Sequence, residues 1–436
     1  MPTVAFHTLG CKVNQYDAQA MLELFEQAGY TACAFNEKAD VYVIMTCTVT
    51  GTGDKKSLQA VRRAQRLNPE GNIIIAGCLA QRDGEKLLET TAARLVIGNQ
   101  GRKNVVELLE DAIHNNQRIA SVSDVLRIPV EPLEISAHEG HTRAVLKIQE
   151  GCDRYCTYCI IPYVRGGIRS RQPEDIAQEA RRLAMAGFSE LVLTGIHLTS
   201  YGRDLGNCTL MDGIRACMQP GIERIRLGSL EPVIVTEEFV EQLKQTPVCP
   251  QFHLALQSGC DAVLQRMRRR YTTDQFRTAC ALLRKAFPGC AITTDVICGF
   301  PQETEAEFEE TCAFCREIGF ARMHVFPYSA RTGTKAAQMS GQVLKKVREE
   351  RARHLIAIGN QLNRDYREKL VGQDVQVLCE EIIDGLAAGY TDTYIPCRFD
   401  RGEPGEMALV HITGLSDDGV AGEVRRNSEF RIQNSE

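Results

Sequence analysis

Short apolar runs alternate with amphipathic stretches along the first 130 residues. The runs have the length and the β-branched content of strands, and they cover residues 4–8, 41–46, 73–76 and 94–97. The stretches between them, such as 18–28 and 55–67, repeat apolar residues at helical spacing. This alternation predicts a parallel sheet with helices on its faces.

The same alternation resumes after residue 143. Six further runs are strand-like: 145–149, 191–194, 224–227, 252–256, 291–297 and 322–326. Each of the first five precedes a helical pattern, for example 173–186 or 304–318. Six βα units are too few for a closed eight-stranded barrel, so we predict an open, partial (β/α)6 barrel with the charged helix 345–370 at its edge.

Beyond Gly372 the chain contains short strand-like runs separated by Gly, Pro and Asp, which is typical of a small β-barrel. Residues 129–142 lack periodicity and contain two prolines, as a linker does. The predicted fold class is α/β, in the following parts: an N-terminal open parallel α/β sheet domain (1–128), the linker (129–142), the central partial barrel (143–370) and a small OB-like β-barrel (371–436).

The composition is that of an ordinary soluble protein, with 436 residues, 44% hydrophobic and 25% charged. No apolar run is long enough for a transmembrane helix, and the first residues do not form a secretory signal, so we expect a cytoplasmic protein. In a reducing compartment the 18 cysteines are more commonly metal ligands or catalytic thiols than disulfides.

Charge is unevenly distributed. Residues 371–436 hold 5 Arg, no Lys and 13 Asp or Glu, a net charge of −8, whereas the whole chain carries −5, which leaves +3 for the rest. The basic residues of this remainder gather in four groups: Arg62, Arg63 and Arg66; Arg165, Arg169 and Arg171; Arg266, Arg268, Arg269 and Arg270; Lys345, Lys346, Arg348, Arg351 and Arg353. Such groups suit a phosphate-bearing partner, although a single group usually serves only as a solvated helix face.

Three cysteines with the spacing C-x3-C-x2-C form the strongest local motif: Cys152, Cys156 and Cys159. They follow the first strand of the predicted barrel, at the mouth where βα enzymes carry out chemistry. Three thiolates suit a four-iron cluster with one iron left open. The alternatives are a zinc site completed by a distant ligand and three thiols in a core.

A second trio is dispersed along the sequence: Cys11, Cys47 and Cys78. Each follows a predicted strand, at the edge where open α/β sheets bind ligands, with Asn14, Gln15 and Gln81 close by. From the residues alone, a cluster and buried structural cysteines remain equally open. The other 12 cysteines are expected in cores; Cys312 and Cys315, for example, share a helix face with Phe308.

Taken together, these residues resemble the methylthiotransferase family within the radical S-adenosylmethionine superfamily, over essentially the whole chain. The N-terminal motifs are GCKVNQYD (10–17), TCTVT (46–50) and GCLAQ (77–81), and the radical motif spans 151–166. The barrel motifs are LTGIHLTSYG (193–202), SLEP (229–232), LQSG (256–259), DVICGFPQE (295–303) and FPYSARTGT (326–334). The C-terminal part resembles the family's RNA-binding TRAM module.

The resemblance implies two four-iron (4Fe–4S) clusters, one on each cysteine trio, and S-adenosylmethionine as a further cofactor. The open iron of the Cys152 trio would bind S-adenosylmethionine and generate a radical, and the Cys11 trio would hold the sulfur that becomes methylated. Residues expected to contact S-adenosylmethionine are Tyr158, Gly195, Ser229, Glu231 and Asp295, although each also suits an ordinary packing, turn or capping role. Arg165, Arg169 and Arg171 would flank the mouth and hold tRNA phosphates.

Members of the family act on threonylcarbamoyl-adenosine in tRNA, on isopentenyl-adenosine in tRNA or on an aspartate of a ribosomal protein. The start at Cys11–Gln15 and the SLEP form resemble the threonylcarbamoyl branch most, so tRNA is the expected substrate, with an electron donor and a sulfur source as unidentified partners. A rival of another class is a zinc protein that binds nucleic acid without catalysis. The acidic C-terminal part is unusual for RNA binding: either Tyr390, Tyr394 and Arg398 recognise RNA by shape, or the barrel packs on the enzyme and the arginine groups elsewhere supply affinity.

Overall fold

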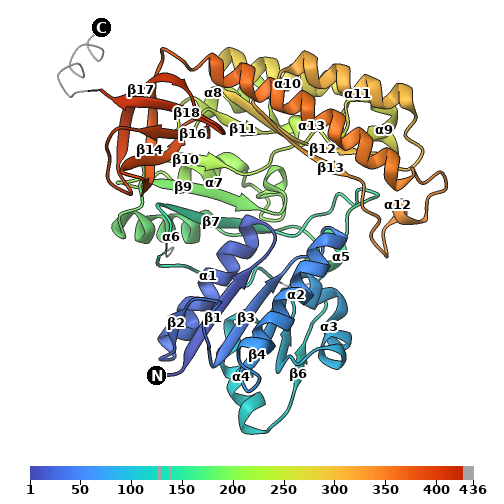
Figure 1. Ribbon diagram of the computed structural model, residues 1–436, viewed down its shortest axis with the longest axis vertical. Coiled ribbons are helices and arrows are strands. Elements are labelled where there is room, and N and C mark those ends of the chain that lie inside the picture. The colour runs from blue at the N-terminus through green and yellow to red at the C-terminus, as the bar shows by residue number, and fades with distance from the viewer. Residues whose placement is uncertain (126–128, 138–139, 426–436) are drawn as a thin grey trace.

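A six-stranded parallel sheet forms the N-terminal domain of the computed structural model, which describes residues 1–125, 129–137 and 140–425 (Figure 1). Its strands, in spatial order, are β2 (Thr31–Cys33), β1 (Thr3–Thr8), β3 (Val41–Thr46), β4 (Asn72–Gly77), β5 (Leu95–Ile97) and β6 (Ile119–Ser121). The helices are α1 (Lys12–Gln27), α2 (Gly51–Leu67), α3 (Cys78–Thr90) and α4 (Val105–His114), preceded by the 3-10 turn η1 (Arg102–Asn104). Every residue of β3 is buried, because helices cover both faces of a parallel sheet.

The four strands predicted for this domain are confirmed. The two additional strands, β2 and β6, lie at the edges of the sheet and have only three residues each. Neither has a fully buried residue, so a search for apolar runs could not find them.

The central domain is an open barrel of six parallel strands, as predicted. These are β7 (Arg143–Glu150), β9 (Glu190–Gly195), β10 (Arg224–Leu227), β11 (Gln251–His253), β12 (Ala291–Cys298) and β13 (Arg322–Pro327). Single bridges such as Leu230 to Leu254 join the β10 and β11 regions, and the short β8 (Arg169–Ser170) pairs antiparallel with β7.

Helices cover the outside of this barrel (Figure 1). The helices of this part of the chain are α5 (Ile161–Arg165), α6 (Pro173–Met185), α7 (Leu210–Ala216), α8 (Glu237–Leu243), α9 (Asp261–Arg266), α10 (Thr273–Ala286), α11 (Glu305–Ile318), α12 (Lys335–Gln338) and α13 (Lys345–Glu368), with 3-10 turns η2 (Leu198–Ser200) and η3 (Pro232–Ile234). Of these, α5 packs on the N-terminal domain instead. Cys312 and Cys315 of α11 are fully buried in the core, as expected. Within the described residues, no helix combines the length and the apolar character needed to cross a membrane.

The last barrel strand, β13, has one covered face and one open face. Met323 points outward and packs next to Gly359 of α13. Arg322, His324 and Phe326 alternate with the covered residues, face the inside of the barrel and are exposed. The inner wall of the barrel is therefore open on this side.

The C-terminal part is a closed five-stranded β-barrel, as predicted, with residues 426–436 of the acidic tail lying outside the described residues. Its strands are β14 (Asp374–Ile383), β15 (Leu386–Thr391), β16 (Pro396–Phe399), β18 (Val420–Val424) and β17 (Met407–Leu415). The sequence LAAGYT of β15 did not suggest a strand, because its small residues give a weak apolar pattern.

This small barrel docks on the central barrel through an aromatic pair. The rings of Tyr390 and Tyr394 stack with their centres 4.7 Å apart, and the guanidinium of Arg143 lies about 5 Å from each ring. Arg226 lies 4.7 Å from the Tyr394 ring and donates a hydrogen bond to the main-chain oxygen of Asp392 at 2.9 Å. Of the two roles considered for these tyrosines, the structure supports packing of the barrel on the enzyme.

A buried network of six charged side chains joins the N-terminal and central domains: Asp17, Arg102, Glu131, Lys147, Glu150 and Arg165. Asp17 of α1 accepts hydrogen bonds from both Arg102 and Lys147. Arg102 also pairs with Glu131 at 3.0 Å, so this part of the predicted linker is fixed between the two domains. Three acids and three bases balance one another, which is the condition under which buried charge is tolerated.

We expect Asp17→Asn to lower the free energy of unfolding by about 3–5 kcal/mol, because it leaves Arg102 and Lys147 buried beside a neutral group. Urea denaturation followed by circular dichroism measures the change. The matched control is Glu368→Gln, which removes an exposed ion pair with Arg364 and should change stability by less than about 1 kcal/mol. If Asp17→Asn lowers the free energy of unfolding no more than the control does, the network does not hold the domains together.

Candidate functional site

The loop between β7 and α5 carries Cys152, Cys156 and Cys159 at the carboxyl end of the first barrel strand. Its backbone is fixed locally, since the Cys152 amide donates to the Gly166 oxygen at 2.9 Å and the Cys159 amide donates to the Cys156 oxygen at 3.0 Å. Burial raises the pKa of Cys152 to about 11 and that of Cys159 to about 12. Metal binding at these thiols must therefore displace protons.

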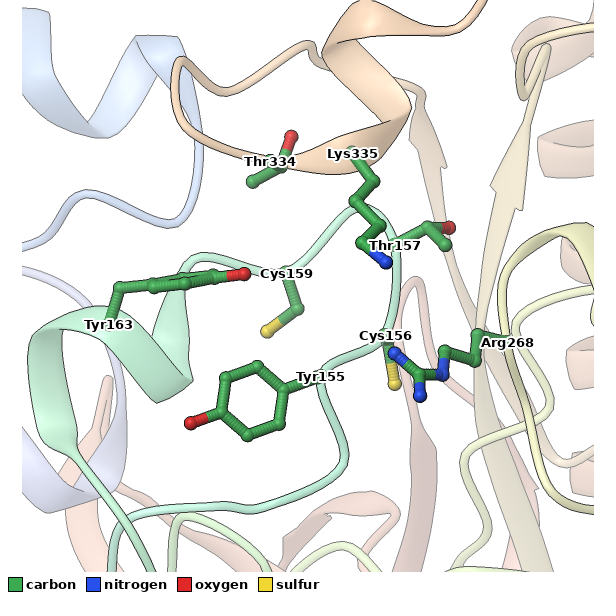
Figure 2. Close-up of a pocket in the computed structure, with 8 residues that line it drawn as sticks. All are labelled: Tyr155, Cys156, Thr157, Cys159, Tyr163, Arg268, Thr334 and Lys335. Atoms are coloured by element: carbon green, nitrogen blue, oxygen red, sulfur yellow. The ribbon is translucent and has the colours of Figure 1, made fainter. Parts of the chain in front are cut away.

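A cavity of about 200 Å³ opens beside two of these thiols (Figure 2). In the view of Figure 2, Tyr155 and Tyr163 lie on one side of Cys156 and Cys159, and Arg268 lies on the other. Thr157, Thr334 and Lys335 complete the lining. The cavity gives the trio room for a bound group beyond its own side chains.

Glu231, in the loop that follows the third barrel strand, connects this trio to three basic side chains. Arg269 donates to the Cys156 sulfur at 3.2 Å and pairs with Glu231 at 3.0 Å, and Arg154 pairs with the same carboxylate at 3.0 Å. Burial alone would raise the pKa of Glu231, but contact with His197 and the charges of Arg269 and Arg154 outweigh it and lower that pKa to about 2. Glu231 is therefore ionised at neutral pH.

Two buried atoms at this point have no hydrogen-bond partner within the described residues. Glu231 Oε2 and His197 Nε2 lie 3.3 Å apart but are not aligned as a hydrogen bond. Glu231 Oε2 still has the charge of Arg154 at 3.0 Å, whereas His197 Nε2 is left without a partner. Because buried polar atoms are nearly always satisfied in native proteins, the His197 nitrogen suits contact with a polar ligand. The charged and polar groups around Cys156 are compatible with a polar ligand such as S-adenosylmethionine, and the contact of Glu231 with it stays a prediction.

The other predicted cofactor contacts lie in different settings. Gly195 ends β9, and a Cβ there would lie 2.9 Å from Gln149, so its small size is needed for packing. Ser229 is exposed just after β10. Asp295 lies inside β12, 3.3 Å from His253, and Tyr158 packs on an apolar cluster. Their roles toward the cofactor stay predictions.

The second trio lies where β1, β3 and β4 end. Gly10 and Gly77 precede Cys11 and Cys78, and both have positive φ angles (105° and 95°) that favour glycine. A Cβ at Gly10 would lie 3.0 Å from the Cys47 Cβ, so this loop touches the next one only because the side chain is absent. Burial raises the pKa of Cys47 to about 11, and the neighbouring Cys78 and Cys11 thiols add to the rise. The three cysteines are therefore brought together.

Arg165 connects the two trios. It ends the short helix α5, which begins two residues after Cys159, and its Nε donates to the Cys78 sulfur at 3.1 Å. The same guanidinium pairs with Glu150 at 2.8 Å and donates to Asn14. Because Ile160 and Val164 also pack on Cys78, the loop that carries the first trio forms a wall of the second.

The prediction that Arg165, Arg169 and Arg171 hold tRNA phosphates at the mouth is wrong. Their exposed fractions are only 0%, 6% and 7%. Arg171 pairs with Glu179 at 2.5 Å, and Arg169 donates to the main-chain oxygen of Arg165. These arginines neutralise buried acids and support the backbone, which a run of charges in a sequence cannot reveal. The contacts of Arg154 and Arg269 with Glu231 were not predicted from the sequence. The basic run 266–270 contains Arg269, whereas Arg154 lies within the cysteine motif itself.

A second contact closes the two domains on each other. Arg331, after β13, donates to the hydroxyl of Thr48 at 2.8 Å and pairs with Asp54 at 2.5 Å. Arg82 of α3 pairs with the same Asp54 at 3.1 Å. The loop after Cys47 is thereby fixed against the mouth of the barrel.

The spacing of the thiols bears on the kind of metal group. Across residues 1–125, 129–137 and 140–425, no three His, Cys, Asp or Glu side chains are arranged around a single ion. Zinc holds its sulfur ligands at about 2.3 Å from one centre, whereas a cluster places several atoms between the thiolates. Three thiolates in each trio are compatible with a cluster, which would place its own atoms between them.

Comparison with known families and proteins gives consistent matches. Residues 3–98 match the uncharacterized protein family UPF0004, and residues 146–315 match the radical SAM superfamily. The chain is 44% identical to the threonylcarbamoyladenosine tRNA methylthiotransferase MtaB of Bacillus subtilis (strain 168), over 92% of this chain and 90% of that protein. It is 36% identical to the MtaB protein of Aquifex aeolicus (strain VF5), over 89% and 95% of the two chains.

Two further matches are more distant in function or sequence. The chain is 36% identical to a tRNA-2-methylthio-N(6)-dimethylallyladenosine synthase of Parafrankia sp. (strain EAN1pec), over 93% of this chain and 83% of that protein. Its fold is similar to that of the radical S-adenosylmethionine methyltransferase TsrM from Kitasatospora setae, with a TM-score of 0.55 and 13% identity over 77% of this chain and 75% of that one. The latter match concerns the fold alone.

We expect Glu231→Gln to weaken S-adenosylmethionine binding about tenfold or more, because Arg154 and Arg269 lose their counter-charge and the ligand loses a charged partner. Equilibrium dialysis at several pH values measures this. Since the pKa of Glu231 is about 2, the wild-type affinity should not depend on this group between pH 6 and 8. Glu237→Gln, at an exposed position of α8, serves as the comparison. Equal affinity of the Glu231→Gln variant and the wild type would exclude a role for Glu231 in binding.

Proposed function

This chain belongs to the methylthiotransferase family within the radical S-adenosylmethionine superfamily, and we propose that it adds a methylthio group to C2 of N6-threonylcarbamoyladenosine at position 37 of tRNA. One observation carries the proposal: two cysteine trios from different domains meet at one barrel mouth, joined by Arg165. A reaction that needs both a radical and a sulfur donor requires two such groups close together. The 44% identity with the Bacillus subtilis protein supports the choice of nucleoside.

The family uses an iron–sulfur cluster and S-adenosylmethionine, and we propose that this chain holds two four-iron clusters, one on each trio. Each trio has a cationic hydrogen-bond donor on one sulfur, Arg269 on Cys156 and Arg165 on Cys78. Donors of this kind orient ligands and stabilise the charge of a thiolate. When bound, the first cluster and S-adenosylmethionine supply the radical chemistry that activates an unreactive C–H bond.

The protein's own residues position these groups. Glu231 offers an ionised carboxylate that Arg269 links to Cys156 of the first trio, where it suits a polar part of S-adenosylmethionine. Arg331 and Asp54 fix the loop that follows Cys47 against the barrel.

The proposal assigns tRNA as the substrate and requires an electron donor and a sulfur source, which we leave as unidentified partners. A tRNA substrate implies action in the cytoplasm. Since the tyrosine pair of the C-terminal barrel packs on the enzyme, we assign the phosphate contacts to exposed cations such as Arg62, Arg268 and Lys345.

We expect Cys78→Ser to lower iron from about eight to about four atoms per chain, because it removes a ligand of one cluster only. The variant should still cleave S-adenosylmethionine but should not transfer the methylthio group. Iron analysis and product detection after anaerobic reconstitution measure both effects. Cys312→Ala, in the core of the barrel, is the matched control and should keep all the iron; unchanged iron in Cys78→Ser would contradict the second cluster.

We expect tRNA from a strain lacking this protein to contain threonylcarbamoyl-adenosine without its methylthio group. Mass spectrometry of digested tRNA detects the loss, and wild-type protein, but not Cys156→Ser, should restore the product. Loss of the methylthio group from isopentenyl-adenosine instead would replace the proposed substrate. An unmodified ribosomal-protein aspartate together with unchanged tRNA would assign the chain to the third branch of the family.

A further inference from the structure

Lys12 is a cation without a carboxylate partner beside the second trio. It is the first residue of α1 and directly follows Cys11. Its ammonium lies 5.7 Å from the centre of the Tyr394 ring, which belongs to the C-terminal barrel. In the part of the chain that the structure describes, no acidic side chain lies within ion-pair distance of it. The lysine is half-buried.

The acids around Lys12 are already taken by arginines. Arg224 and Arg226 pair with Glu190 at 2.5 and 2.9 Å, and Arg143 pairs with Glu380 at 2.7 Å. A third acid, Asp392, lies within electrostatic reach of the same arginines, and burial raises its pKa. Three carboxylates thus face three arginines and Lys12, so the group carries an excess positive charge.

Two stacked tyrosines lie beside these cations. The Tyr394 ring, stacked on Tyr390, faces the ammonium of Lys12 and the guanidinium of Arg226. An aromatic face stabilises a cation by a modest amount and leaves its N–H donors free for another partner. A half-buried ammonium without an anion is otherwise unfavourable, which suits a site completed by a ligand.

The position of Lys12 connects it with the reacting base. It directly follows Cys11, a ligand of the proposed sulfur-bearing cluster. Arg322, on the exposed inner face of β13, lies within electrostatic reach of Tyr390, the ring that stacks on Tyr394. The threonylcarbamoyl group extends from N6 of the adenine whose C2 would react, and it ends in a carboxylate. The isopentenyl group is a neutral hydrocarbon and offers nothing to an ammonium.

We propose that Lys12, held over Tyr394, binds the threonyl carboxylate of the substrate nucleoside and thereby selects threonylcarbamoyl-adenosine over isopentenyl-adenosine. This inference rests on the proposed function and names the residue that sets its specificity. Lys12 acts on binding and on the position of the base, and it takes no part in the radical step.

The test compares two anticodon stem-loops that differ only in charge. One carries N6-threonylcarbamoyladenosine, and the other carries the same nucleoside with its carboxylate replaced by a carboxamide. Fluorescence anisotropy under anaerobic conditions gives the two dissociation constants for the reconstituted enzyme. We expect the wild type to bind the carboxylate form about 10- to 100-fold more tightly, as for a hydrogen-bonded charge pair.

The variants then locate this preference. Lys12→Gln should bind both loops equally, and Lys12→Arg should keep a preference for the carboxylate. Lys86→Gln, at an exposed position of α3, should behave as the wild type. Iron is measured in each variant because Lys12 adjoins Cys11. If Lys12→Gln loses iron, the result for Lys12→Arg decides. A Lys12→Arg variant that does not prefer the carboxylate loop overturns the proposal.

The remaining outcomes separate the two levels of inference. If Lys12→Gln keeps the preference of the wild type, the proposed role of Lys12 is overturned. The role is also overturned if the wild type binds both loops equally and Lys12→Gln lowers both affinities by the same factor; Lys12 is then at most a phosphate contact. A wild type that methylthiolates an isopentenyl-adenosine loop but not the threonylcarbamoyl loop refutes the proposed function itself.

Discussion

The arrangement of this protein depends on a balanced group of buried charges between its first two domains. Asp17 on α1 holds two cations at once, and Arg165 pairs with Glu150 while also donating to Cys78. Any rotation of one domain against the other would leave a buried charge without its partner, at a cost of several kcal/mol. The position of the second trio relative to the barrel is therefore fixed by electrostatics. The distance between the two trios, on which the proposed reaction depends, is fixed in the same way.

Individual contacts around the two cysteine trios also fix the loops that carry them. Gly10 allows the Cys11 loop to touch the Cys47 loop, and Arg331 fixes the latter against the barrel mouth. On the other side, Arg269 serves both Cys156 and Glu231. Each trio thus lies in a preorganised polar setting, which is what a reaction with short-lived radicals requires, because misplacement by about 1 Å is costly.

The acidic C-terminal barrel is explained by its place in the assembly. Its tyrosine pair packs on Arg143 of β7 and Arg226 of β10, so the barrel is a packing partner of the enzyme rather than a basic RNA clamp. Its acid Glu380 neutralises Arg143 across the interface. Lys12 remains as the cation that these acids do not satisfy, and the substrate's own carboxylate is the partner that the proposed function would bring there.

The sequence by itself determined the architecture and the six ligand cysteines as candidates. Long buried strands appear in the sequence as apolar runs, and C-x3-C-x2-C is a pattern of residues close together in sequence. Both could therefore be predicted from local sequence alone. The short edge strand β6 could not be predicted, because none of its residues is fully buried.

Only the tertiary structure decided which charges serve the site. Arg165 was interpreted as a phosphate contact because a basic run looks the same whether it is solvated or buried. Its partner Asn14 lies 151 positions away in sequence, and Arg331 and Thr48 are 283 positions apart. Electrostatic pairing depends on distance in space and on exclusion of water, and neither quantity exists until the domains have packed.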